Sequence, residues 1–290
     1  MPQLSPDFDA SQQEFHDATD VLFGGESSGA LGAMLNANKA GELVKGYTDG
    51  NAEFRVLSDA GWFLDVPNYE NGNYTSEWFK HIVEMRNMTS QFDKSCRNSM
   101  SENHVWKCFL PYYNFPHIEA PVFLIQSDLD IYQLETFYFN DVEAGVHCVE
   151  NPMSNCTPDL FAATDRFRGM FKKHMDLPRK TPSTGIFLDS CFAHVQTKSN
   201  NHWNNPLVQG VTMAEAIQHW YFQEKDVNEP KTYKYEDKKP WPHVHQSCDT
   251  AINFSAWYDM DLKKGLWKDD ATNDSWPPPQ VLVSDPSVGR

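Results

Sequence analysis

The sequence has no apolar run that approaches the roughly 18 consecutive residues of a membrane span. It is also poor in positive charge: 24 Lys and Arg face 40 Asp and Glu, which gives its 290 residues a formal net charge of −16. An acidic surface argues against nucleic acid and anionic lipid as partners. The N-terminal residues MPQLSPDFDASQQ lack the basic-then-apolar pattern of a signal peptide. We therefore expect neither a membrane span nor nucleic-acid binding.

The sequence also lacks a Cys-x-x-Cys pair, so its cysteines indicate neither a zinc nor a redox motif. An even number of cysteines suits a disulfide framework, and six allow about fifteen connectivities. The cysteines are Cys96, Cys108, Cys148, Cys156, Cys191 and Cys248. Asn-x-Ser/Thr sequons occur at Asn73, Asn87, Asn155, Asn253 and Asn273. Together these features favour a secreted glycoprotein with disulfide bonds.

Cys248 could bind a metal ion instead of forming a disulfide. His243-Val244-His245 lies close to Cys248, but no further ligand follows at a usual spacing. We expect no metal and no cofactor.

Short apolar segments alternate with helix-like segments along the chain. This alternation predicts an α/β fold, with a mostly parallel sheet and helices on both faces. We expect strands near residues 21–24, 54–57, 122–126 and 186–188, and helices near 29–44, 76–88, 159–175 and after the capping box of Thr212 and Glu215. No repeat or linker divides the sequence, so we predict one domain over residues 1–265 and a loose tail over 266–290.

The segment Gly25-Glu26-Ser27-Ser28-Gly29 follows the first expected strand and leads into a helix. Gly-x-Ser-x-Gly in that context is typical of the nucleophile elbow of α/β-hydrolases, which exposes a serine hydroxyl at the carboxyl edge of the sheet. The flanking glycines would let the chain turn without a Cβ clash. The pattern alone is common by chance, and Ser27 could be an ordinary turn serine.

Two further strands end in residues that could complete a catalytic triad. Ser27, Asp130 and His194 follow strand ends in the chain order of α/β-hydrolases. The chemistry needs these types, because a serine must lose its proton to a histidine that a carboxylate orients. Asp128 competes with Asp130, and His194 is one of 11 histidines.

Several segments resemble the pectin acetylesterase/Notum family. They are the elbow at 25–29, Leu57-Ser58-Asp59-Ala60-Gly61-Trp62-Phe63-Leu64-Asp65, Asp130-Ile131-Tyr132-Gln133-Leu134, Ser190-Cys191-Phe192-Ala193-His194, and Trp241-Pro242-His243 before Cys248. The resemblance runs from about Asp20 to Cys248. It implies an α/β-hydrolase fold in which Ser27, Asp130 and His194 are the triad, and so selects Asp130 over Asp128.

The resemblance also bears on the cysteines. The spacing of Cys96 and Cys108 is similar to that of Notum-type members and implies a disulfide between them. We also expect the pairs Cys148–Cys156 and Cys191–Cys248.

The chain departs from the family pattern around the oxyanion hole. Ser28 and Ala30 replace the family's usual Ala and Gly, but the backbone N–H of Ser28 can still donate to an oxyanion. Family members carry a longer segment before the elbow, with a Gly-Gly-Gly-Trp-type stretch that supplies further donors. Only 26 residues precede Ser27 here. We therefore expect an N-terminally incomplete chain that lacks the first strands and has impaired activity.

The acyl side of the expected site has Leu31, Phe63, Phe109 and Tyr132. Leu31 and Tyr132 would fill space, as in the acetylesterase type, whereas Gly61-Trp62-Phe63 and Trp241-Pro242-His243 are closer to Notum. We predict a monomeric, secreted serine O-deacylase for a short-chain ester of an extracellular glycan or protein. The alternatives are a Notum-like palmitoleoyl-protein carboxylesterase and a non-catalytic hydrolase-fold protein.

Overall fold

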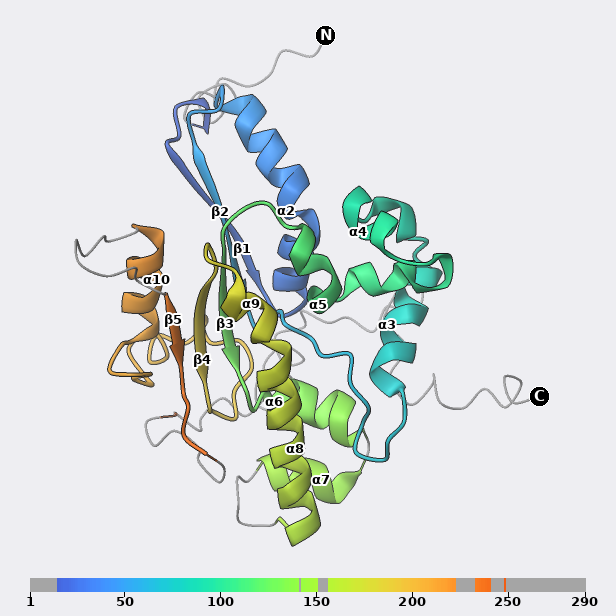
Figure 1. Cartoon of the computed structure of the whole chain (residues 1–290). Coiled ribbons are helices and arrows are strands. Elements are labelled where there is room, and N and C mark those ends of the chain that lie inside the picture. The colour runs from blue at the N-terminus through green and yellow to red at the C-terminus, as the bar shows by residue number, and fades with distance from the viewer. Residues whose placement is uncertain (1–14, 141, 151–155, 223–232, 241–247, 249–290) are drawn as a thin grey trace, which may run out of the picture. The chain divides into compact units, whose positions relative to one another are not determined.

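The centre of the protein is a parallel sheet. The computed structural model (Figure 1) describes residues 15–140, 142–150, 156–222, 233–240 and 248. Within them, five strands lie in the order β1-β2-β3-β4-β5, and every neighbouring pair is parallel. The strands are β1 Asp20–Glu26, β2 Glu53–Asp59, β3 Val122–Ser127, β4 Gly185–Asp189 and β5 Lys234–Glu236. This sheet confirms the predicted α/β class, and the first four strands match the expected segments.

The α-helices fall mainly between successive strands. They are α2 Ser28–Tyr47, α3 Tyr74–Met85, α4 Lys94–Ser99, α5 Pro111–Asn114, α6 Ile131–Gln133, α7 Glu143–Glu150, α8 Pro158–His174, α9 Asp176–Lys180 and α10 Met213–Tyr221. Short 3₁₀ turns span Thr89–Gln91, Glu102–Phe109 and Phe115–His117, and a π-helical turn spans Leu134–Phe139. The capping box predicted at Thr212 is formed: its side chain accepts from the Glu215 N–H, and the Glu215 carboxylate bonds back to the Thr212 backbone N–H.

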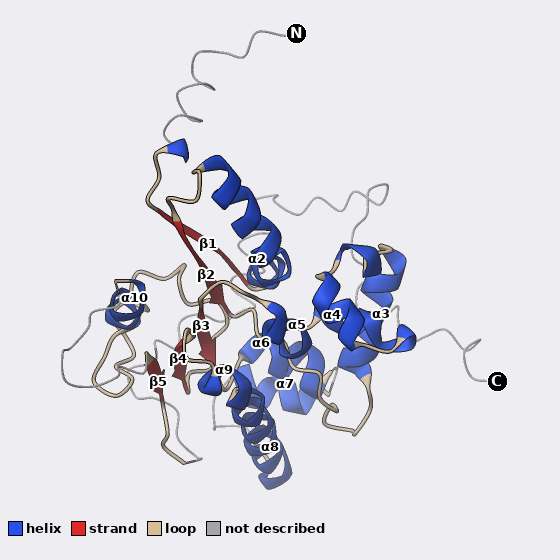
Figure 2. Cartoon of the chain, turned by 45° about the horizontal axis from the view of Figure 1, so that its top comes forward, coloured by secondary structure: helices blue, strands red, loops and turns tan. Residues whose placement is uncertain are grey.

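Helices cover both faces of the sheet. Figure 2 shows α10 on one side and α2, α5 and α8 on the other. On the α10 side, Phe123 and Ile125 of β3 and Phe187 of β4 pack with Met213 and Trp220. On the opposite side α2 lies against β1 and β2 and buries Leu31 and Met34. Burial on both faces explains why β3 and β4 read as continuous apolar runs.

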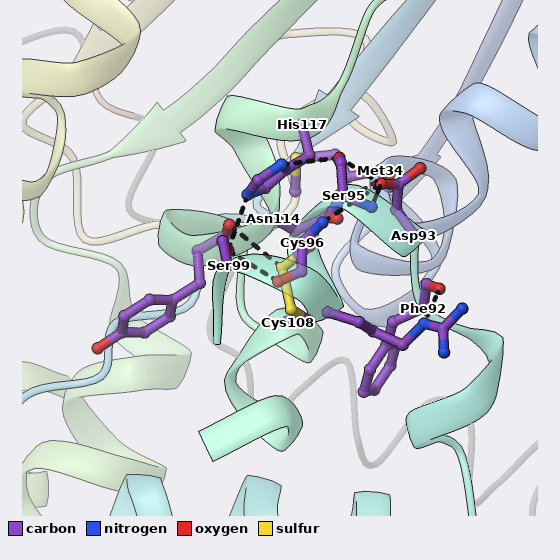
Figure 3. The surroundings of a disulfide bond; sticks show 11 residues. Met34, Phe92, Asp93, Ser95, Cys96, Ser99, Cys108, Asn114 and His117 are labelled. Carbon is purple, nitrogen blue, oxygen red and sulfur yellow. Dashed lines mark hydrogen bonds between the residues drawn. A yellow bond between two sulfur atoms is a disulfide. The ribbon is translucent and has the colours of Figure 1, made fainter. Parts of the chain in front are cut away.

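The structure forms three disulfides, Cys96–Cys108, Cys148–Cys156 and Cys191–Cys248, which are the expected pairs. Cys96–Cys108 holds α4 against the 3₁₀ turn Glu102–Phe109 (Figure 3). Beside it, His117 hydrogen-bonds the hydroxyls of Ser95 at 2.8 Å and Ser99 at 3.4 Å. No element was expected in this segment, whose turns are too short for a clear periodic pattern.

All described residues belong to one compact unit. The predicted boundary at residue 265 and the predicted tail lie outside the described residues and stay predictions. None of the described helices is long and apolar enough to cross a bilayer.

Candidate active site

Ser27 lies on a strained turn between β1 and α2. Its φ of 52° and ψ of −122° fall in the region that residues with a Cβ rarely adopt. The turn is held at both ends, because the Ser27 N–H donates to the Asp59 carbonyl at 2.7 Å and the Leu31 N–H donates to the Ser27 carbonyl at 3.0 Å. Such strain persists only where the surrounding structure over-determines it, and it gathers at functional sites.

Of the two glycines that flank the elbow, only Gly25 lies where a larger side chain would clash. A Cβ on Gly25 would lie 2.5 Å from the backbone carbon and oxygen of Gly29, whereas a Cβ on Gly29 would meet nothing within 4 Å. The expectation that both glycines relieve a clash is therefore wrong for Gly29. Gly61, in the loop after β2, supplies the second close approach: its Cβ would lie 2.6 Å from the Ala30 Cβ.

The structure brings Ser27, His194 and Asp130 into one hydrogen-bonded chain. His194 Nε2 lies 2.8 Å from Ser27 Oγ, and His194 Nδ1 lies 3.0 Å from both carboxylate oxygens of Asp130. A carboxylate only accepts hydrogen bonds, so Nδ1 carries the proton and Nε2 is left to accept from the serine hydroxyl. Asp130 is completely buried and the His194 side chain is 3% exposed, whereas Ser27 is half-buried.

Asp128, the competing carboxylate, forms a buried ion pair with residues of α8. Both of its oxygens lie 3.0 Å from Arg168 Nε of α8, and Lys172 Nζ lies 3.1 Å from one of them. Asp128 and Arg168 are both buried. Asp128 therefore holds α8 against the end of β3, and Asp130 is the carboxylate that contacts the histidine.

Two buried glutamines that the sequence analysis missed complete the surroundings of Asp130. Gln126 Nε2 and Gln133 Nε2 donate to Asp130 Oδ2 at 2.7 and 3.1 Å. Their amide oxygens accept from the backbone N–H groups of Trp62 at 3.1 Å and Leu64 at 2.9 Å. The two amides thus connect the Asp130 carboxylate to the loop that carries Phe63. The available signal was a glutamine inside the apolar strand β3, where a polar side chain needs a partner.

The four residues expected on the acyl side do not all gather at the triad. Tyr132 stacks on the His194 ring with centroids 4.9 Å apart, and Phe63 lies 6.3 Å from the same ring. Phe109 packs instead against Phe79 and Phe92, with centroids 5.7 and 6.2 Å away. Leu31 is buried in the first turn of α2, one turn after Ser27.

The remaining candidates lie at the surface or outside the described residues. Ser28 is the exposed first residue of α2, with its backbone N–H at the helix N-terminus. Asn73 and Asn87 are exposed. The sequons at Asn155, Asn253 and Asn273, the pair His243 and His245, and the segment 241–243 lie outside the described residues. In the described part of the chain no group of three or more His, Cys, Asp or Glu could hold a metal ion.

Comparison with known proteins places this geometry in a family. Residues 9–249 match the model of the Pectinacetylesterase family. Pectin acetylesterase 7 of Arabidopsis thaliana is 26% identical over 213 residues, which cover 71% of this chain and 52% of the relative. The palmitoleoyl-protein carboxylesterase notum1 of Xenopus laevis is 26% identical over 264 residues, which cover 86% of this chain and 51% of the relative.

A solved structure shares the fold. The Wnt deacylase Notum from Drosophila superposes with a TM-score of 0.57 at 19% identity, over 79% of this chain and 59% of that one. This chain spans about half the length of the curated relatives it matches. The family match covers most of the sequence, including all three residues of the hydrogen-bonded chain. The protein therefore belongs to the pectinacetylesterase family.

Proposed function

We propose that the protein is a serine carboxylic-ester hydrolase. The observation that carries this proposal is the chain from Ser27 Oγ through His194 to Asp130, at the carboxyl ends of β1, β3 and β4. The named activities of its relatives agree, since pectin acetylesterases and palmitoleoyl-protein carboxylesterases both cleave esters. The strained backbone at Ser27 supports the proposal, because a nucleophile elbow places its serine on such a turn.

The reaction uses each member of this chain in turn. His194 Nε2 takes the hydroxyl proton as Ser27 attacks the ester carbonyl, and Asp130 stabilises the imidazolium that forms. The Ser28 N–H, at the start of α2, donates to the oxyanion, where the helix dipole adds to the effect. His194 then protonates the leaving alcohol, and water hydrolyses the acyl-enzyme.

The residues beside His194 favour a short acyl group. Tyr132 stacks on the His194 imidazole. Phe63 contacts both rings, with its centroid 6.4 Å from that of Tyr132 and 6.3 Å from that of His194. These aromatic rings occupy space that a long chain would need. We therefore propose an acetyl-type ester of an extracellular glycan or protein as substrate, handled by a secreted enzyme whose disulfides suit an oxidising compartment.

A palmitoleoyl-type ester is the second candidate. The notum1 match covers 86% of this chain, a larger share than the 71% covered by the pectin acetylesterase match at the same identity. Hydrolysis of p-nitrophenyl acetate and octanoate separates the two: a short-chain enzyme has the higher kcat/KM on acetate, and a long-chain enzyme on octanoate.

Ser27→Ala tests the proposal as a whole. We expect a loss of at least about 10³-fold in kcat/KM on p-nitrophenyl acetate, because the nucleophile is gone. Ser28→Ala is the matched control, since it keeps the backbone N–H and its side chain is exposed. We expect it to stay within about threefold of wild type. Equal rates in wild type and Ser27→Ala above the uncatalysed rate would exclude Ser27 as the nucleophile. Rates of both proteins equal to the uncatalysed rate would identify a non-catalytic protein.

A further inference from the structure

Asp59, the last residue of β2, hydrogen-bonds both the proposed nucleophile, Ser27, and the loop that follows the proposed base, His194. Its backbone carbonyl accepts from the Ser27 N–H at 2.7 Å. Its carboxylate oxygen Oδ2 accepts from the backbone N–H groups of Gln196 at 2.8 Å and Thr197 at 2.7 Å, and from the Thr197 hydroxyl at 2.7 Å. Asp59 is 1% exposed, so water does not compete for these bonds.

The loop that Asp59 holds begins directly after His194. Val195, between His194 and Gln196, has a φ of 62°, a left-handed backbone that is unfavourable for a β-branched residue. Such a conformation costs on the order of 1–3 kcal/mol and persists only where neighbouring bonds enforce it. The three bonds to Asp59 Oδ2 lie immediately beyond this residue.

We propose that Asp59 is a positioning residue that sets the distance between the Ser27 hydroxyl and the His194 imidazole. It acts on the serine through its main chain and on the histidine through its side chain. The inference rests on the proposed function, because it assigns Asp59 a part in the same reaction. Asp59 does not touch the reacting atoms, and its effect reaches them through the elbow and through loop 195–197.

The hydrogen bonds of Asp59 fit a positioning role. Burial raises the pKa of its carboxyl, and the N–H and hydroxyl of Thr197 and the charge of His194 oppose the rise. Its other oxygen, Oδ1, has no hydrogen-bond partner among the described residues. All three donors meet one oxygen, so Asn can replace Asp59 and keep that acceptor, whereas Ala cannot.

The test compares Asp59→Ala, Asp59→Asn and Thr197→Val in the full chain. We expect Asp59→Ala to lower kcat on p-nitrophenyl acetate by about 10²-fold, since small misplacements of catalytic groups cost this much. KM should change by less than about threefold, because the acyl side keeps its residues. The kcat of Asp59→Asn should lie within about tenfold of wild type. The kcat of Thr197→Val, which loses one of the three hydrogen bonds, should fall by about threefold to tenfold.

The rate of inactivation by diisopropyl fluorophosphate gives a second measurement. It reports the reactivity of Ser27 without an acyl chain, and it should fall in the same order as kcat. Glu236→Ala is the control for general destabilisation, because Glu236 is a buried carboxylate at the far strand β5 whose partner is Arg179. It should lower the unfolding midpoint and leave kcat unchanged.

Crystal structures of the variants separate this inference from the proposed function. In Asp59→Ala the distance from Ser27 Oγ to His194 Nε2 should exceed about 3.5 Å, the limit of a hydrogen bond, and in Asp59→Asn it should return to the wild-type value. A wild-type distance in Asp59→Ala would overturn the inference whatever the activity. If Asp59→Ala does not fold, a wild-type kcat and distance in Thr197→Val would overturn it equally. If the wild-type protein is inactive but the distance from Ser27 Oγ to His194 Nε2 lengthens in Asp59→Ala, only the proposed function is overturned.

Discussion

Tyr132 lies almost parallel to the imidazole of His194, with ring centroids 4.9 Å apart and planes inclined by 28°. The phenol is largely buried, and burial, together with the charge of Asp130, raises its pKa, so it stays neutral at working pH. Tyr132 sits two residues after Asp130, so the same turn, α6, that presents the carboxylate also places a ring over its histidine. One short segment thus provides both the carboxylate that bonds His194 and the ring proposed to limit acyl length.

Replacing Tyr132 with Ala should shift selectivity towards longer acyl chains. We expect the ratio of kcat/KM for p-nitrophenyl octanoate to that for acetate to rise by about tenfold, because the ring no longer occupies the space beside His194. Tyr112→Ala is the control, since Tyr112 is exposed and packs on Tyr113 and His174. An equal fall on both esters would show that Tyr132 only orients the histidine.

Gln133 should matter through its hydrogen-bond donor to Asp130. Gln133→Glu keeps an oxygen for the Leu64 N–H but sets a second carboxylate against Asp130. Gln133→Met removes all three side-chain hydrogen bonds, with Asp130, the Trp62 carbonyl and the Leu64 N–H, without adding charge. At pH 8 we expect both variants to lose activity, with Glu about tenfold lower in kcat than Met, because two adjacent carboxylates repel each other. Equal kcat values in the two variants would mean that Gln133 contributes by packing alone.

The two aspartates after β3 should separate activity from stability. Asp130→Asn should lower kcat by about 10³–10⁴-fold with little change in the free energy of unfolding. Asp128→Asn leaves the buried Arg168 without its carboxylate, and should lower that free energy by about 3 kcal/mol while the folded enzyme keeps its kcat. Urea unfolding and initial rates measure the two quantities, and a reversed pattern would assign the triad to Asp128.

Asp189, at the end of β4, should make stability depend on pH. Complete burial raises the pKa of its carboxyl to about 7, although the Cys191 N–H opposes the rise. An unfolded carboxyl titrates near 3.9, so from about pH 4 to 7 the native state binds a proton that the unfolded state lacks. This contribution to stability is present below pH 4 and is lost as pH rises through about 7.

Asp189→Asn removes that dependence. We expect the stability of the variant relative to wild type to rise by on the order of 1–3 kcal/mol between pH 5 and pH 8. Over that range the wild-type carboxyl loses its contribution, whereas the amide stays neutral. Urea unfolding at both pH values measures the difference, with Asp165→Asn on the exposed face of α8 as control. A difference between Asp189→Asn and wild type that does not change with pH would contradict the expectation.

The two elbow glycines should respond differently to Ala. Gly25→Ala places a methyl 2.5 Å from the Gly29 backbone and should cost about 1–3 kcal/mol and most of the activity. Gly29→Ala meets open space in the first turn of α2 and should be neutral or stabilising by up to about 1 kcal/mol. Thermal unfolding measures the change in stability, and kcat on p-nitrophenyl acetate measures the change in activity. Equal losses of stability and activity in the two variants would contradict the steric explanation.

Much of the framework could be predicted from local patterns. Four strands, the helix after the elbow and the capping box at Thr212 were found because apolar periodicity and turn chemistry act over a few neighbouring residues. The strand β5 was missed, because Lys234 and Glu236 in a three-residue strand carry no such pattern. Its contacts come from distant residues: it pairs with β4, and the Arg179 guanidinium bonds Glu236 from 57 residues away.

The sequence by itself determined which residue types follow the strand ends, and therefore the order of Ser27, Asp130 and His194. Parallel strands bring their carboxyl ends to one edge, so this local information was enough to nominate the site. Tertiary structure decided which side chains meet there. Arg168 pairs with Asp128, the two glutamines bond Asp130, and Phe109 packs against Phe79. These choices depend on partners distant along the chain, whose positions follow only from how the whole core packs.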